Sequence, residues 1–569
     1  MSSHVRAGFR PRIRLDALKL AHKLWEALDT PLSLGLYLRA KHHCFADLVA
    51  VDPNPRDYLN PEDFYLDYQA SKFLSQYPFL DTGTNLELAG VKKFLEAEVA
   101  CRKTNERFRM RTEGVVATPR VEQVLTLAQR KIAFILGDVP SLDRLDFSFG
   151  PGANFGVRGD TSVLDKVSST LECTYAFSSV LGEFLAEFPG WIKTQSVDVS
   201  LVRGSELTFV PKNAKTHRPI CIEPLLNGLY QKGVGSYIRE RLSRHGVLLR
   251  DQGVNQRLAK AAFYSDLSTV DLSSASDTIS YGLVLDLLPV EWFEFLDVAR
   301  SPNFCYQGEW YPFEKFTSMG NAYTFELETL IFYALASACC EVDQIPFKTG
   351  SDLHVYGDDI IIPRAAFDLF AEIVEYCGFT LNRQKTYRDG VFYESCGCDY
   401  FMGWNVRPYR LKRRINQPLE AIYAANTIRR IALRICLLGG ESKARAVLRI
   451  YPWVVAEIPQ KYRHFGPEGQ GDGHLIANLD EAAPRRDRRF EGWRYHTVVK
   501  VPRSKDAVEV PDGFALYGTR IQGGARLPDG LPFDGKVYLR GGDRLRVVNP
   551  FCQQWQDWCP PGLLSDVHN

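Results

Sequence analysis

The sequence lacks any long apolar run. No stretch reaches the roughly 18–20 consecutive apolar residues that cross a bilayer, and the longest candidate, Leu330 to Cys340, is typical of a buried helix. The N-terminal residues MSSHVRAGFRPRIRL contain arginines but no apolar segment of a secretory signal. They are equally typical of an RNA-touching arm and of a solvated end. The sequence therefore predicts no membrane association.

A strong net charge and a disulfide pattern are also missing. The net charge is +1, so any contact with nucleic acid has to come from local basic patches. The 13 cysteines are scattered and odd in number, which favours reduced thiols in a cytosol. Cys396 and Cys398 form a C-x-C without a second ligand pair, so we interpret them as buried thiols and not as a zinc site.

The chain has 569 residues and the composition of a globular protein. This length is too great for one hydrophobic core, so we expect two to four structural units. Apolar spacing predicts helices over residues 91–109, 121–136 and 419–438. The Gly-rich residues 149–159 favour a flexible loop over a phosphate cradle. Residues 465–550 are predicted to be irregular. Within them, residues 484–495 interleave arginines with aromatic side chains, as in an RNA-binding segment or a solvated loop.

Residues 353–363, LHVYGDDIIIP, predict a strand, a tight turn and a second strand. Gly-Asp is common turn chemistry, so the motif alone is weak. The second run is strongly apolar, however, which predicts a buried hairpin. Two carboxylates about 4 Å apart repel by roughly 4 kcal/mol at an effective dielectric constant of 20. Asp358 and Asp359 therefore indicate a site that needs a divalent cation.

A second acidic motif, STVDLSSASDTIS, covers residues 268–280. Asp271 ends a short strand, and Asp277 is expected near the start of a helix, where each alone is an ordinary turn or cap residue. If the two strands are neighbours in one sheet, Asp271 meets Asp358 and Asp359 at one edge. Such carboxylates can hold two Mg²⁺ ions, with Mn²⁺ as a substitute, for phosphoryl transfer. The metal ligands and catalytic residues are therefore predicted to be Asp271, Asp358 and Asp359.

Three flanking segments supply further candidates. Residues 317–336, TSMGNAYTFELETLIFYALA, begin with a Ser/Gly/Asn loop that is expected to lie against template and ribose, and continue as an amphipathic helix. Cations in residues 209–224 suit a triphosphate. Lys385 is a candidate general acid for the pyrophosphate leaving group. The nucleotide-binding candidates are Lys212, Lys215, Arg218, Asp277, Ser318, Gly320 and Asn321.

The motifs VDLSSASD, SMGNAYTFELE, VYGDD, NRQKT and FYESCG occur in the order of viral polymerase motifs. With FVPKNAKT and IEP they closely resemble the replicase β subunit of leviviruses, the Qβ-like RNA phages. The resemblance is strong over residues 200–405 and thin beyond about 415. It implies an α+β right-hand polymerase with fingers, a ferredoxin-like palm and a thumb. We assign residues 1–90 to an N-terminal region bridging to the fingers, 91–260 to fingers with the basic nucleotide segment, 261–405 to the palm and 406–569 to the thumb and C-terminal region.

The resemblance also implies activity, partners and location. We expect an RNA-dependent RNA polymerase that copies plus and minus RNA strands from a single-stranded template and nucleoside triphosphates. By position, Asp277, Ser318 and Asn321 are expected to recognise the ribose, and Lys212, Lys215 and Arg218 the triphosphate. Relatives work with the host elongation factors Tu and Ts and a large ribosomal RNA-binding protein. The expected location is the cytoplasm of the infected bacterial host.

Two alternatives stay open at the level of sequence. A reverse transcriptase shares the palm and the Asp-Asp turn, but it would carry a bulky aromatic residue two positions after the first Asp, where this chain has Ser273. A non-catalytic RNA-binding palm protein would not need the intact aspartates. Both features favour the RNA polymerase.

Overall fold

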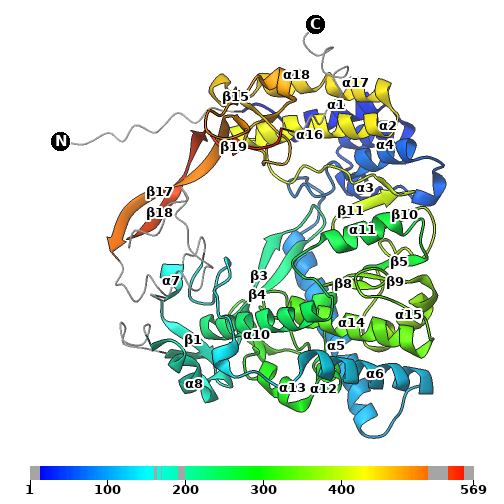
Figure 1. Ribbon diagram of the computed structural model, residues 1–569, viewed down its shortest axis with the longest axis vertical. Helices are drawn as coiled ribbons and strands as arrows, with labels where there is room; N and C mark the ends of the chain where they lie inside the picture. Colours follow the sequence, from blue (N-terminus) through cyan, green and yellow to red (C-terminus); the bar gives the residue numbers. More distant parts are fainter. Residues whose placement is uncertain (1–12, 159–162, 168, 190–198, 510–535, 556–569) are drawn as a thin grey trace.

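Helices and small, mainly antiparallel sheets are mixed along the chain in the computed structural model, which confirms the α+β class (Figure 1). The structure describes residues 13–158, 163–167, 169–189, 199–509 and 536–555. The basic N-terminal residues 1–12 lie outside them. Two large hydrophobic cores hold most of the buried side chains.

The central sheet has the strand order β5-β9-β8, formed by Leu267–Val270, Asp359–Pro363 and His354–Tyr356. The apolar run of β9 is buried on both sides. Ile360 and Ile362 belong to the first large core, whereas Ile361 joins a small cluster with α11 (Gly253–Ala261). Successive strand residues point to opposite faces, so a continuous apolar run is what a strand covered on both faces requires. The predicted buried hairpin is confirmed.

The first core is built around α14 (Thr324–Val342), which contacts β8 and β9 of the central sheet. The sequence predicted a helix here with a buried apolar stripe, and the helix is confirmed, but its burial extends beyond that stripe. Glu326 and Glu328 are buried together with the apolar residues, because α6, α10, α15 and the sheet cover the helix on all sides. The neighbouring helices are α5 (Leu86–Thr112), α6 (Pro119–Leu136), α10 (Leu225–Arg244), α12 (Tyr281–Leu287), α13 (Val290–Asp297) and α15 (Phe367–Tyr376).

The second core joins the two ends of the chain. Helices from residues 17–72 pack against helices from residues 418–456, and Figure 1 shows them together above the central sheet. The described part of segment 1–90 thus packs mainly on segment 406–569. The helices are α1 (Ala17–Leu28), α2 (Pro31–Lys41), α3 (Phe45–Ala50), α4 (Pro61–Lys72), α16 (Pro418–Leu437), α17 (Glu441–Leu448) and α18 (Tyr451–Ala456).

The basic segment forms the hairpin β3 (Ser205–Pro211) and β4 (His217–Ile222). It belongs to the four-stranded sheet β4-β3-β6-β7, completed by Asn303–Tyr306 and Glu309–Pro312. The other described strands form small sheets: β1 (Leu171–Thr174) with β2 (Val199–Val202), β10 (Phe392–Ser395) with β11 (Cys398–Phe401) and β12 (Trp404–Asn405), β13 (Phe465–Gly466) with β14 (Leu475–Ile476), and β15 (Arg485–Arg486) with β16 (Trp493–Arg494) and β19 (Phe551–Cys552). Short helices α7 (Val163–Val167), α8 (Leu181–Ala186) and α19 (Leu479–Ala482) complete the described helices.

The C-terminal region is more regular than the sequence predicted. Residues 465–550 contain the long antiparallel pair β17 (Thr497–Glu509) and β18 (Lys536–Val548), so the expectation of an irregular segment is wrong there. The pair extends away from the helices of the second core (Figure 1). Strands in hairpins are stabilised by their partner, and residues 510–535 separate these two strands in the sequence. Local composition therefore gave little sign of the pairing.

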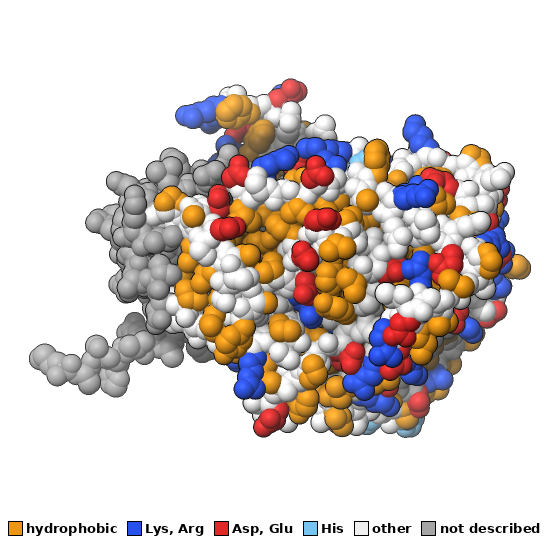
Figure 2. Space-filling model, turned by 90° about the horizontal axis from the view of Figure 1, so that it is seen from below, with side chains coloured by type: hydrophobic (Ala, Val, Ile, Leu, Met, Phe, Trp, Pro, Cys, Tyr) orange, Lys and Arg blue, Asp and Glu red, His pale blue; other side chains and the backbone are white. Residues whose placement is uncertain are grey.

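Surface charge follows the balanced composition. On the face seen from below in Figure 2, basic and acidic side chains are interspersed among apolar ones. This agrees with the net charge of +1. Any contact with nucleic acid therefore has to come from local groups of basic residues.

Candidate active site

Two neighbouring strands bring the three aspartates to one edge of the central sheet. In the antiparallel pair β5 and β9, Val270 lies opposite Ile360. Asp271 follows Val270 and Asp359 precedes Ile360, so the register places Asp271 across from Asp359. Asp358 lies in the turn between β8 and β9. The central geometric expectation from the sequence, that these residues meet, is what the structure shows.

The turn itself depends on a glycine. Gly357 has a φ of +62°, and a Cβ added there would lie 2.5 Å from Cε2 of Phe325. Its backbone N–H donates to Oγ1 of Thr329 on α14 at 3.0 Å. Only glycine combines this backbone conformation with so close an approach. The turn that carries Asp358 is thereby fixed against α14.

Burial makes the two adjacent aspartates hard to ionise. It raises the pKa of Asp358 to about 6, and the nearby charges of Asp359 and Asp271 add to the rise. The pKa of Asp359 is also raised, mainly by burial. On α14, burial and Asp358 hold the pKa of Glu328 well above its usual range. A divalent cation bound by oxygen ligands would relieve this crowding of buried carboxyl groups.

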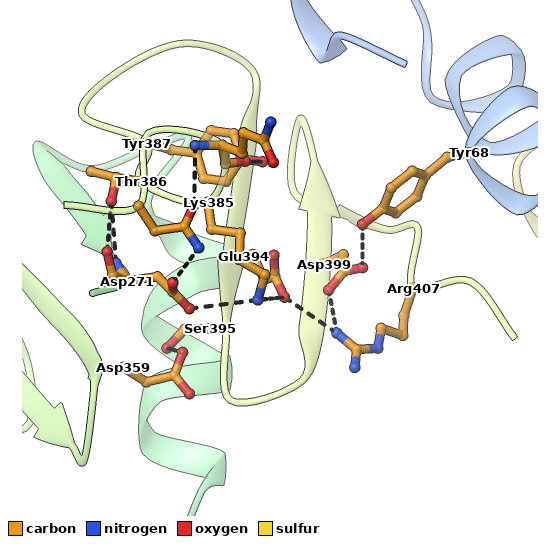
Figure 3. Close-up of polar contacts among 12 residues, drawn as sticks. Tyr68, Asp271, Asp359, Lys385, Thr386, Tyr387, Glu394, Ser395, Asp399 and Arg407 are labelled. Atoms are coloured by element: carbon orange, nitrogen blue, oxygen red, sulfur yellow. Dashed lines mark hydrogen bonds and ion pairs between the residues drawn. The ribbon is translucent and has the colours of Figure 1, made fainter. Parts of the chain in front are cut away.

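Side chains from the segment that follows α15 contact Asp271 (Figure 3). Asn382 Nδ2 donates to its Oδ1 at 2.7 Å, and Lys385 Nζ lies 3.5 Å from its Oδ2. Oγ1 of Thr386 donates to its backbone carbonyl at 3.1 Å. Burial lowers the pKa of Lys385, but the carboxyl groups of Glu394 and Asp271 raise it by more, so the amine is protonated. The predicted general acid thus lies beside a predicted metal ligand.

A line of alternating charges leads away from Lys385 (Figure 3). Its amine is 3.5 Å from Oε1 of Glu394. Arg407 lies 3.6 Å from the same oxygen and 2.6 Å from Oδ1 of Asp399. Tyr68 on α4 donates to Asp399 at 3.0 Å. The site is therefore tied through β10 and β11 to a helix near the start of the chain.

The basic hairpin reaches the aspartates through Lys212. Burial lowers the pKa of Lys212, and so do the charges of Lys93, Arg218 and Lys385, while Asp271 raises it. Lys212 and Lys215 lie in the turn between β3 and β4, and Arg218 lies in β4. Both Lys215 and Arg218 are exposed. The structure thus brings Lys212 into the electrostatic neighbourhood of both Asp271 and Arg218.

Asp277 lies in a buried ion cluster. Nζ of Lys315, which is 0% exposed, is 3.1 Å from Oδ1 of Asp277 and 3.2 Å from Oε1 of Glu98. Ser318 Oγ donates to the same oxygen of Asp277 at 3.3 Å. The 3₁₀ turn η4 (Ala275–Asp277) ends at Asp277, and Ser280 caps the next helix. Asp277 therefore lies near the start of α12, as expected, but Ser280 and not Asp277 caps that helix.

The Ser/Gly/Asn loop is shaped by backbone contact. Gly320 has a φ of +116°, and a Cβ added there would lie 2.0 Å from the carbonyl oxygen of Cys221 on β4. The Cys221 N–H donates to the carbonyl of Met319 at 2.8 Å. Asn321 accepts a hydrogen bond from the N–H of Tyr323 at 3.1 Å. The loop therefore packs on the basic hairpin, and Ser318 faces Asp277.

Several residues of the site escaped the sequence analysis as individuals. Asn382 and Glu394 lie inside the quoted motifs NRQKT and FYESCG, so the signal was present but unassigned. Lys315 stands just before the Ser/Gly/Asn loop and gave no sign of its role. Its partner Glu98 comes from α5, more than 200 positions earlier, and only the fold brings the two together.

Carboxylates gathered beside lysines suit enzymes that transfer nucleotides through phosphoryl chemistry, the class to which nucleic-acid polymerases belong. The model of the family "RNA replicase, beta-chain" matches residues 17–505. The chain belongs to this family and is an RNA-directed RNA polymerase. The recognition made from the motifs is confirmed, and with it the right-hand polymerase fold.

Relatives match over nearly the whole chain. The RNA-directed RNA polymerase subunit beta of Escherichia virus Qbeta is 34% identical over 97% of this chain and 91% of its own length. The corresponding subunit of Enterobacteria phage SP is 36% identical over 80% of this chain and 78% of its own. The solved RNA-dependent RNA polymerase of a human picobirnavirus is 14% identical, with a TM-score of 0.32 over 45% of this chain and 59% of that one. The fold assignment rests on the family.

Proposed function

We propose that the protein copies a phage positive-strand RNA genome and its minus strand by two-metal nucleotidyl transfer. The observation that carries the proposal is the meeting of Asp271, Asp358 and Asp359 at one sheet edge. Family membership and the intact aspartates favour this activity over a reverse transcriptase or a non-catalytic palm protein.

The proposed metal ligands are Asp271, Asp358 and Asp359, for two Mg²⁺ ions or Mn²⁺ in their place. Their oxygen atoms suit hard cations, and bound cations would offset the burial and the charges of Asp359 and Asp271 that raise the pKa of Asp358. Bound ions would activate the attacking 3′-hydroxyl and neutralise the leaving pyrophosphate. No preformed group of three or more metal-binding side chains occurs within the described residues.

The chain's own cations have separate tasks in this proposal. Lys212 and Arg218, with Lys215 in the same turn, bind the triphosphate. Lys385 carries the proton that the pyrophosphate oxygen accepts as it leaves. Its two carboxylate neighbours keep the amine charged and aim it at the site until substrate is bound.

Asp277, Ser318 and Asn321 recognise the ribose in the same proposal. The 3.3 Å bond between Ser318 and Asp277 places a hydroxyl and a carboxylate together, and this pair suits a sugar that offers two hydroxyl groups. Gly320 lets the loop approach the basic hairpin closely.

Partners and location follow from resemblance. We infer a single-stranded RNA template and nucleoside triphosphates as substrates, with the host elongation factors Tu and Ts and a large ribosomal RNA-binding protein as partners. The proposed location is the cytoplasm of the infected bacterium. Among the described residues, no helix has the length and apolar character to cross a membrane.

The variant Asp358→Asn tests the metal assignment. Loss of one ligand is expected to reduce RNA synthesis at least about 100-fold, since the ions contribute several kcal/mol and each 1.4 kcal/mol is tenfold. RNA binding, measured by filter retention, is expected to change little. The matched control is Asp368→Asn, an exposed aspartate on α15 in the same region. Equal synthesis by Asp358→Asn and the control would contradict the proposal.

A further inference from the structure

A second cavity lies away from the three aspartates, against the first turn of α16. It measures about 500 Å³ and is bounded by the loop before the helix and by the start of β17. Leu411, Leu419, Tyr423 and Val498 supply apolar surface. A cavity of this size with an apolar lining and a few polar groups suits a small planar ligand.

Glu420 lines this cavity, and one of its carboxylate oxygens accepts no hydrogen bond from the described residues. Oε2 of Glu420 is buried and accepts no hydrogen bond within the described part of the chain. Its other oxygen, Oε1, lies 3.9 Å from Nζ of Lys500, beyond hydrogen-bond distance. A buried acceptor left unsatisfied is costly. Neither oxygen of Glu420 therefore accepts a hydrogen bond from the described residues, and Lys500 is its ion-pair partner.

The cavity also offers positive charge. Lys412, Arg413 and Lys500 are exposed and line it. The other acidic residue of the lining, Asp472, is already engaged, with Arg430 at 2.9 Å and Asn426 at 3.0 Å. Lys500 is the ion-pair partner of Glu420, so Lys412 and Arg413 are the cations that remain available to an anionic group of a ligand.

We propose that this cavity binds a guanine nucleotide, either free or within single-stranded RNA. Among the four RNA bases, guanine alone presents two adjacent N–H donors, N1–H and the N2 amino group, on its Watson–Crick edge. The two oxygens of Glu420 match this pair as charge-assisted acceptors. The apolar residues cover the faces of the base, and Lys412 or Arg413 binds the phosphate.

The test is equilibrium binding of guanosine and the four nucleoside monophosphates to the full chain without divalent metal. Monophosphates cannot be polymerised, so binding is read independently of the proposed catalysis. We expect GMP to bind at least tenfold more tightly than AMP, CMP or UMP, and Glu420→Gln to remove that preference. The matched control is Glu441→Gln, an exposed glutamate in the first turn of α17, which should bind as the wild type does.

A second variant and a second ligand sharpen the result. Lys412→Gln is expected to weaken GMP severalfold but to leave guanosine unchanged, which separates phosphate contact from base contact. Binding of uridine pentamers with and without one central guanine is measured as well, to distinguish a free nucleotide from a base within an RNA strand as the ligand. Loss of affinity for GMP in Glu420→Gln indicates a free nucleotide as ligand, and loss for the guanine-containing pentamer together with GMP shows that the site also accepts the base within an RNA strand; both support the proposal. An unchanged GMP affinity in Glu420→Gln, or an equal loss for all four bases, would overturn it.

Discussion

Replacing Lys315 by methionine probes the buried ion cluster beside the Ser/Gly/Asn loop. The lysine is fully buried, and Asp277 and Glu98 lie 3.1 and 3.2 Å from its amine. Each pair attracts by roughly 5 kcal/mol at an effective dielectric constant of 20, but desolvation of the three charges cancels much of this gain. Removing one member leaves two buried carboxylates without a cation, which typically costs about 3–5 kcal/mol.

Urea unfolding followed by circular dichroism gives the measurement. Lys315→Met should lose about 3–5 kcal/mol. Arg102→Met breaks an ion pair with Glu314 in which the arginine is 63% exposed, and it should lose less than about 1 kcal/mol. Adding Asp277→Asn to Lys315→Met should recover part of the loss, because it removes one unpaired charge. The reasoning is refuted if Lys315→Met costs no more than Arg102→Met.

Three further outcomes are expected. Lys212→Ala should raise the KM for nucleotides severalfold with a smaller effect on kcat, because a triphosphate contact is lost; an unchanged KM in steady-state synthesis would indicate a merely solvated lysine. Gly320→Ala should destabilise the protein by about 1–3 kcal/mol more than Gly308→Ala. A Cβ at residue 320 would lie 2.0 Å from the Cys221 carbonyl oxygen, whereas a Cβ at residue 308, where φ is +88°, would meet nothing within 4 Å. Equal unfolding midpoints of the two variants would argue against that contact. Burial raises the pKa of Glu223 to about 7 from 4.5, so the folded state keeps a proton that the unfolded chain releases, and stability falls as the pH rises between these values. Glu223→Gln should therefore gain up to roughly 3 kcal/mol relative to wild type between pH 5 and 8, and a difference independent of pH in urea unfolding would contradict this.

Local sequence determined the long helices and the acidic hairpin. The apolar spacing over residues 91–109, 121–136 and 419–438 predicted α5, α6 and α16 to within a few residues at each end. The run after Asp359 predicted a buried strand, and the Asp271 motif predicted a strand end. Helix periodicity and strand burial are encoded within short windows, so a single sequence contains them.

Interactions between distant segments escaped this reasoning. The burial of Glu326 and Glu328 depends on helices that cover α14 from other parts of the chain, and the pairing of β17 with β18 joins strands separated by residues 510–535. A short window carries no information about what covers a helix from far away in the sequence. The burial of these glutamates was therefore not predicted, and the irregular C-terminal region was predicted wrongly.

The sequence by itself determined the residue types of the site, namely the aspartates, the basic turn and Lys385, and their order identified the family. Only the tertiary structure decided how these groups share charge. It placed Lys385 between Asp271 and Glu394, linked Lys315 to Glu98 and Asp277, and left one oxygen of Glu420, a cavity-lining residue, without a hydrogen bond from the described part of the chain. The physical reason is that pKa shifts and ion pairs depend on distance and burial, and the fold sets both.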